Sequence, residues 1–337
     1  MIKTPHIVDF HAHLMSLAGA EKLCPIEQQS PFFKYVVPVI EPIAQFTEPV
    51  HDRWLRKLAM HYRCETSRFV YSQLGQFFLM EALRLFKTHG LERLLQSMER
   101  QKIEHTVIYS LEPLTHTRDI LELLSPYPNK FSVFGSVSHS EPDPCAYLEP
   151  LMRDKLIRGV KIHPMVGSYE AQGLFDAVKD YVALASDYGL PVAIHTGDIP
   201  ASALSELTTC STVKELEPLF KGFPSCRFII NHSGWESWRA AFDMATAYDN
   251  VFLETSWQPA KIIRRAVDKI GAGRVLFGSD FPMFQQWQAL REVRRALTEK
   301  EFELVASRNG MELLGLDRLL LSKSRPREAS VSSQPIC

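Results

Sequence analysis

The sequence predicts an α/β fold, and within that class a (β/α)₈ barrel. Short apolar runs of strand length recur from the N-terminus to about residue 280, and helical patterns separate most of them. This alternation is typical of parallel βα units. No glycine-rich phosphate-binding turn follows the first run, which argues against a doubly wound open sheet, the main structural alternative. A chain of 337 residues is long for one domain but ordinary for a barrel.

The eight predicted strands are short and rich in apolar side chains. They cover residues 6–10, 105–109, 131–137, 157–162, 191–195, 226–231, 250–254 and 274–279. The predicted helices between them have apolar residues at helical spacing. They cover residues 91–103, 115–124, 147–156, 174–188, 238–248 and 259–270. Two further helical segments, 285–297 and 299–314, follow the eighth strand.

Residues 14–90 depart from this repeat, because a βα unit needs far fewer residues before its second strand. Five prolines between residues 24 and 49 predict an irregular first part, and residues 51–87 have a helical pattern. We therefore expect a long, mainly helical insertion between the first and second strands. Residues 77–86 are apolar on most sides and need a partner surface. They predict a lid over the barrel mouth or, as the alternative, a contact in a homodimer.

The composition favours a small-molecule substrate. The 38 basic and 39 acidic residues give a net charge of −1, so nothing in the charge points to nucleic acid or an anionic membrane as partner. The six cysteines form no C-x-x-C pair, and no signal-type or membrane-spanning apolar segment is present, so we expect a reduced, cytoplasmic protein. We expect a single barrel over residues 1–320 and a disordered tail over residues 321–337, which is rich in Ser, Pro and charge.

Metal-binding side chains follow several of the predicted strands. His11 and His13 come directly after the first strand, where residues two apart can turn toward one ion. Other side chains end later strands: Lys161 and His163, His195, His232 and Asp280. The C-terminal ends of barrel strands meet around the active site, so these side chains should converge. Imidazole ligands suit zinc, iron, manganese or cobalt.

The ordered set of motifs resembles the amidohydrolase superfamily, in the amidohydrolase-related branch that contains aminocarboxymuconate-semialdehyde decarboxylase. The matching motifs are Asp9-Phe10-His11-Ala12-His13, Gly159-Val160-Lys161-Ile162-His163-Pro164, Pro191-Val192-Ala193-Ile194-His195-Thr196-Gly197, Asn231-His232-Ser233-Gly234, Phe277-Gly278-Ser279-Asp280-Phe281-Pro282 and NGMELLGL over residues 309–316. They extend over residues 6–316 apart from the insertion. Each motif alone is modest evidence, whereas their order along the chain is strong evidence.

This resemblance implies a TIM barrel that holds one divalent ion through the positions of His11, His13, His195 and Asp280. Zinc is the preferred ion, with Mn²⁺, Fe²⁺ and Co²⁺ as alternatives. The position of His232 implies a catalytic residue beside the metal that helps to activate water. Lys161 and His163 are expected to bind substrate, and a second metal would require carboxylation of Lys161, which we rank below a paired ammonium group.

The resulting functional prediction is a metal-dependent hydrolase of a small amide, ester or lactone. A metal-activated water would attack the substrate, His232 would transfer a proton, and Asp280 would act as ligand and proton acceptor. The alternative is a metal-dependent decarboxylase of an unsaturated or aromatic carboxylic acid, and a hydratase ranks third. A non-catalytic ligand-binding barrel ranks last, because the set of metal ligands is complete.

Overall fold

The computed structural model describes residues 6–14, 90–164, 166–167, 173–197 and 213–316. The predicted insertion lies almost wholly outside these residues, and so does the predicted tail. The lid and the dimer contact therefore remain predictions. Among the described residues, no helix is both long and apolar enough to cross a membrane.

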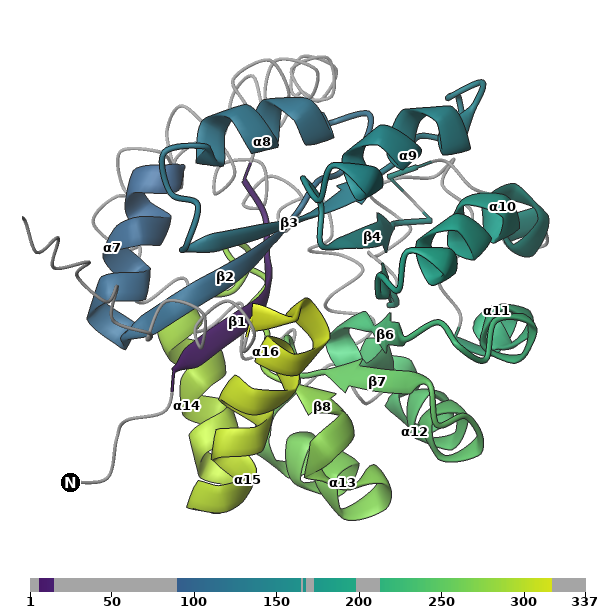
Figure 1. Cartoon of the computed structure of the whole chain (residues 1–337). Coiled ribbons are helices and arrows are strands. Elements are labelled where there is room, and N and C mark those ends of the chain that lie inside the picture. Colours follow the sequence, from purple (N-terminus) through teal and green to yellow (C-terminus); the bar gives the residue numbers. More distant parts are fainter. Residues whose placement is uncertain (1–5, 15–89, 165, 168–172, 198–212, 317–337) are drawn as a thin grey trace, which may run out of the picture.

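Eight parallel strands form the centre of the molecule and follow one another in chain order around the sheet (Figure 1). The strands are β1 Ile7–Ala12, β2 Ile103–Tyr109, β3 Phe131–Ser136, β4 Gly159–Ile162, β5 Val192–Ile194, β6 Phe228–Ile230, β7 Val251–Glu254 and β8 Val275–Leu276. The segment after β8 returns to β1: the Phe10 amide donates to the Phe277 carbonyl (2.8 Å), and Ala12 forms a parallel bridge with Phe281. These contacts close the sheet, which confirms the barrel and excludes the open sheet.

Helices surround the strands (Figure 1). The α-helices are α7 Leu91–Gln101, α8 Thr117–Leu124, α9 Pro144–Arg153, α10 Leu174–Asp187, α11 Glu217–Gly222, α12 Trp238–Ala247, α13 Ala260–Ile270, α14 Gln286–Ala296, α15 Glu299–Glu303 and α16 Asn309–Leu314. Helix α11 was not predicted, because six residues are too few to show a helical period. The other helices begin and end within a few residues of their predicted positions, with α15 and α16 dividing the last predicted segment around a short π-helical stretch, Leu304–Arg308.

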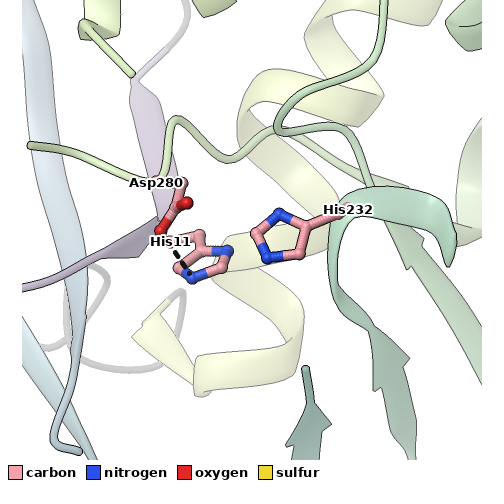
Figure 2. Close-up of side chains that lie close together, drawn as sticks. All are labelled: His11, His232 and Asp280. Atoms are coloured by element: carbon pink, nitrogen blue, oxygen red, sulfur yellow. Dashed lines mark ion pairs between the residues drawn. The ribbon is translucent and has the colours of Figure 1, made fainter. Parts of the chain in front are cut away.

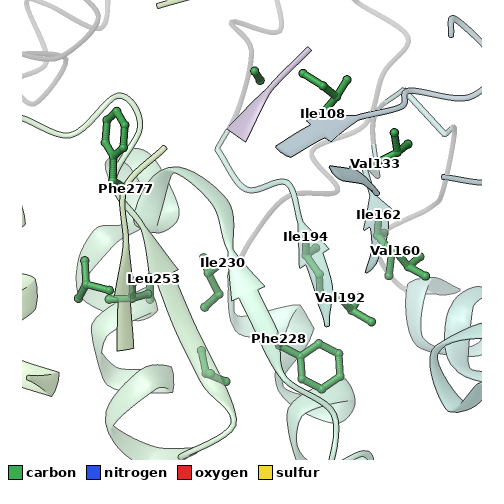
Figure 3. Close-up of a cluster of buried hydrophobic side chains, with 14 of the residues drawn as sticks. Ile108, Val133, Val160, Ile162, Val192, Ile194, Phe228, Ile230, Leu253 and Phe277 are labelled. Atoms are coloured by element: carbon green, nitrogen blue, oxygen red, sulfur yellow. The ribbon is translucent and has the colours of Figure 1, made fainter. Parts of the chain in front are cut away.

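Two apolar layers hold the barrel together, because successive side chains of a strand point to opposite faces. The outer layer lies between strands and helices and includes Ile108, Ile162 and Phe228 (Figure 3). The inner layer fills the barrel with side chains such as Phe10 and Tyr109, and it continues into α16. The barrel is therefore a packed core rather than a pore, and polar chemistry is confined to its ends.

An irregularity in β1 lies beside the metal-binding motif. Asp9 pairs with Thr106 and Ala12 pairs with Ile108, so β1 has one more residue than β2 over this stretch. Extra residues of this kind re-aim side chains and are common next to active sites. Here the irregularity includes His11.

Candidate metal centre

The first and last strands bring three of the predicted side chains together at the C-terminal end of the barrel. His11 lies near the end of β1, His13 directly follows this strand, and Asp280 follows β8. The Nε2 atoms of the two histidines are 3.0 Å apart, and each is 3.2 Å from Asp280 Oδ1. His11 and Asp280 are fully or almost fully buried. Figure 2 shows this ion pair, with the ring of His232 facing His11.

The hydrogen bonds of the two imidazoles determine where their protons are. His13 Nδ1 is 3.0 Å from the carbonyl oxygen of Tyr109, which can only accept, so His13 carries a proton on Nδ1. His11 Nδ1 lies 2.8 Å from Glu254 Oε2 and donates to this carboxylate. Burial lowers the pKa of His11 well below its ordinary value, so the ring is neutral and its Nε2 has a free lone pair.

The Nε2 lone pair of neutral His11, His13 Nε2 and Asp280 Oδ1 therefore face one point. This arrangement is repulsive unless a cation binds, and two imidazole nitrogens with a carboxylate oxygen are ligands that zinc and similar ions prefer. The pKa of Asp280 is below its ordinary value: burial raises it, but His11, His13 and the indole of Trp257 lower it by more. Trp257 Nε1 donates to Asp280 Oδ2 at 2.6 Å, which leaves Oδ1 facing the histidines. The residues present thus fit a divalent ion.

His232 and His195 complete the histidine group. One ligand atom each from His11, His232 and Asp280 lie within 4.8 Å of one another. His232 Nε2 is 3.1 Å from His195 Nδ1, and His195 Nε2 is buried without a hydrogen-bond partner among the described residues. Burial lowers the pKa of both rings well below the ordinary value. A buried imidazole nitrogen with no partner is expected of a metal ligand.

The two residues predicted to bind substrate flank this group. The Lys161 ammonium donates to Asn231 Oδ1 and lies 4.8 Å from the centre of the Tyr109 ring. Burial lowers the pKa of Lys161 to about 7. The ring of His163 stacks on His195, with centroids 3.8 Å apart. His163 Nδ1 accepts a hydrogen bond from the Val166 amide (3.3 Å), so its proton is on Nε2.

His232 lies in a strained turn that follows β6. Four consecutive residues, His232 to Trp235, have φ between 45° and 79°, a backbone conformation that residues other than glycine rarely adopt. The Gln258 amide holds the turn by donating to the carbonyl oxygens of His232 (2.7 Å) and Trp235 (3.0 Å). Gly234 is required here, because a Cβ on it would lie 2.8 Å from Ala241 Cβ. Strain of this kind is concentrated at functional sites.

Several polar residues that support these side chains were not predicted from the sequence, above all Glu254, Ser256 and Trp257. Glu254 is the last residue of β7 and is fully buried. Burial raises the pKa of Glu254 to about 7, although hydrogen bonds from Ser256 and His232 lower it. The position of Glu254 at a strand end is the same signal that selected the histidines and Asp280, and it could have selected this residue too. Ser256 and Trp257 lie beyond the strand end and carry no such signal.

Comparisons with known proteins identify relatives of this chain. The sequence model of the amidohydrolase family matches residues 8–316. An L-fucono-1,5-lactonase from Burkholderia ambifaria is 26% identical over 220 residues, which are 59% of this chain and 72% of that protein.

Two solved structures share the fold at low sequence identity. The 2,6-dihydroxybenzoate decarboxylase from Rhizobium has a TM-score of 0.62 at 14% identity, over 93% of this chain and all of that one (100%). An amidohydrolase from Burkholderia multivorans with bound zinc has a TM-score of 0.52 at 16% identity, over 67% of this chain and 88% of that one. The family match covers most of the chain and includes the first and last site residues. The chain is therefore an enzyme that belongs to the amidohydrolase family.

Proposed function

We propose that this amidohydrolase binds one divalent ion, preferably zinc, through His11, His13, His195 and Asp280. The observation that carries this proposal is the approach of the His11 and His13 Nε2 atoms to 3.0 Å, with Asp280 Oδ1 at 3.2 Å from both. The zinc-bound relative supports the choice of ion. When bound, such an ion polarises a carbonyl group and lowers the pKa of a water molecule to about 7.

We further propose that the reaction is hydrolysis, with a lactone as the preferred substrate class and esters or amides as the other members. The similarity to a lactonase over 59% of the chain supports this choice. His232 is neutral at physiological pH because burial lowers its pKa, and its Nε2 atom, 3.1 Å from His195 Nδ1, is the atom that would take a proton from an attacking water in exchange for this hydrogen bond. Asp280 is ionised because its pKa is lowered, so its carboxylate is a second group that can accept a proton. The protonated Nε2 of His163 is a donor for a substrate oxygen.

Decarboxylation of an aromatic or unsaturated carboxylic acid is the second candidate. It is favoured by one feature of the site, the buried Lys161 ammonium, which would attract a substrate carboxylate. The decarboxylase with the same fold agrees with this candidate without deciding it.

Two measurements test the proposed function. Elemental analysis of protein produced with added zinc should find about one ion per chain, and His11→Ala should remove it. His105→Gln changes a buried histidine outside the site and should leave the ion in place. Wild-type protein without a bound ion, or ion content unchanged by His11→Ala, would refute the metal centre.

The reaction is tested with 1,5-lactones of sugar acids, simple esters and amides, beside 2,6-dihydroxybenzoate. Acid release and CO₂ are measured together. Zinc-dependent lactone opening without CO₂ supports hydrolysis. Turnover of the carboxylic acid alone, with CO₂ released, would replace hydrolysis with decarboxylation.

A further inference from the structure

Glu254 contacts the proposed ligand His11 and the backbone of His232, the proposed catalytic residue. Its Oε2 atom accepts hydrogen bonds from His11 Nδ1 (2.8 Å), the Ser256 hydroxyl (2.7 Å) and the backbone N–H of His232 (3.2 Å). Its Oε1 atom receives the backbone N–H of Ser256. Backbone N–H groups can only donate, so both oxygens of Glu254 act as acceptors, and above pH 7 the carboxylate is ionised and has no proton to donate.

The acceptor role of Glu254 fixes the direction of the next hydrogen bond. The Ser256 hydroxyl proton points to Glu254, so a lone pair of Ser256 Oγ faces His232 Nδ1 at 2.6 Å. His232 must then donate from Nδ1, which places its proton there and leaves a lone pair on Nε2.

The same direction continues to His195. The unprotonated His232 Nε2 faces His195 Nδ1 at 3.1 Å, so His195 carries its proton on Nδ1. The other nitrogen, His195 Nε2, is then a lone pair, and it is the buried atom that has no hydrogen-bond partner among the described residues. Four side chains thus form one directed series, from His195 through His232 and Ser256 to Glu254.

We propose that Glu254 and Ser256 are positioning residues that set the tautomers of His11, His232 and His195, so that the Nε2 atoms of His11 and His195 are available as metal ligands. This inference rests on the proposed metal centre. If the Ser256 hydroxyl pointed the other way, His195 would carry its proton on Nε2 and could not bind the ion. In other proteins, hydrogen bonds that orient the metal ligands in this way contribute about 10–100-fold to metal affinity.

His13 provides an internal comparison. Its tautomer depends on the carbonyl oxygen of Tyr109 and on neither Glu254 nor Ser256. A change in Ser256 should therefore alter His232 and His195 but leave His13 as it is.

The first test needs no metal and no substrate. Metal-free protein is labelled with ¹⁵N in the histidine rings, and the ring nitrogen shifts give the tautomer of each histidine, assigned by single His→Gln variants. The expected result is a proton on Nδ1 in His11, His13, His195 and His232, and on Nε2 in His163. A proton on Nε2 of His232 or His195 in the wild-type protein would overturn the proposal, whatever reaction the enzyme catalyses.

The second test measures zinc affinity by competition with a chelator. Ser256→Ala should weaken zinc binding about 10–100-fold and mix the tautomers of His195, whereas Ser256→Thr keeps a hydroxyl and should bind within a few-fold of wild type. Ser233→Ala is the matched control: this buried hydroxyl donates to the backbone carbonyl of Glu254 (2.7 Å) and lies outside the series. Its affinity should match wild type.

Circular dichroism and thermal melting show whether each variant is folded. Equal zinc affinity in folded Ser256→Ala and in wild type would refute the role of Ser256. Wild-type protein that shows the expected tautomers but binds no zinc would refute the metal centre instead, so the two failures are distinguishable.

Discussion

Replacement of Asp9 tests how the barrel is closed. The Asp9 carboxylate is fully buried and accepts four hydrogen bonds. Its Oδ1 receives the backbone N–H groups of His11 (3.2 Å) and Ser279 (2.8 Å). Its Oδ2 receives the Ser279 hydroxyl (2.6 Å) and the Gln286 amide (2.8 Å). One side chain of β1 therefore joins the strand to the segment after β8 and to α14.

Asp9→Ala would leave three buried donors without this acceptor: the backbone N–H groups of His11 and Ser279 and the NH₂ group of Gln286. Each such group costs about 1–3 kcal/mol when it lacks a partner, so we expect a loss of about 4 kcal/mol in the free energy of unfolding. With an unfolding entropy of about 2.1 cal/mol/K per residue, this loss corresponds to a fall of about 6 °C in Tm for a chain of 337 residues.

Asp9→Asn should be much milder. The amide oxygen can still serve both backbone N–H groups, and its new NH₂ group faces Gln286. Gln286 Oε1 has no hydrogen-bond partner among the described residues, so this amide can turn by half a revolution and accept from Asn at position 9. We expect a loss of about 1 kcal/mol.

The assay is thermal and urea unfolding at pH 8 with a chelator present, so that bound metal does not contribute to stability. Burial raises the pKa of Asp9 to about 7, and at pH 8 the carboxylate is ionised in both states. If Asp9→Asn lost as much stability as Asp9→Ala, the charge rather than the set of donors would be decisive. A loss below about 1 kcal/mol in Asp9→Ala would show that water replaces the carboxylate and would refute the reasoning.

Three further predictions concern residues outside the metal centre. Burial lowers the pKa of His105 to about 4, so the folded state keeps this ring neutral while the unfolded state takes up a proton below pH 6.5. The contribution of His105 to stability is therefore complete above pH 6.5 and is lost as the pH falls toward 4. Between pH 6.5 and pH 4, the free energy of unfolding should therefore fall by about 3 kcal/mol less in His105→Phe than in wild type, as measured by urea unfolding. Gly234→Ala should destabilise the protein by about 2–3 kcal/mol because of its left-handed backbone (φ 79°, ψ 4°) and the contact with α12. Gly315→Ala, also left-handed (φ 65°, ψ 26°) but with open space around it, should cost about 1 kcal/mol, and equal losses would exclude the contact as a cause. The Arg264 guanidinium lowers the pKa of Glu301 to about 2, so this pair stabilises the fold above pH 4.5 and loses that effect as the pH falls toward 2. Glu301→Gln should cost about 1 kcal/mol at pH 7 and nothing at pH 2, and a loss that does not vary with pH would contradict the ion pair as its source.

The strand-end rule accounts for most of what the sequence predicted at this site. Apolar runs are visible in a sequence, and parallel strands must point the same way, so the residues after them converge even when they are far apart in the chain. This is why His11, His195 and Asp280 could be grouped by their sequence positions alone. The same argument explains the predicted barrel, since closure needs only eight such runs in order.

The rest of the site depends on facts that a sequence pattern does not contain. The extra residue in β1 and the positive φ of His232 decide the direction of side chains, and neither has a compositional signature. The direction of hydrogen bonds around Ser256 follows from which atoms meet in space. The predicted lid and tail lie outside the described residues and stay predictions.

Three of the four ligands proposed for the ion come from the first and last strands of the barrel. His11 belongs to the first strand, His13 directly follows it, and Asp280 follows the last strand. The first and last strands meet only after every intervening βα unit has taken its place. The centre is thus an indicator of completed assembly: a partly folded chain lacks it, whatever secondary structure it has formed. Because the ion would bind the closed barrel and not the open one, zinc at 100 times its Kd would add about 2.7 kcal/mol to the free energy of unfolding. Local opening between the first and last strands would be suppressed most. Amide hydrogen exchange in β1 and β8 should then slow on addition of zinc more than exchange in β3 or β4, because the ion would hold the first and last strands together.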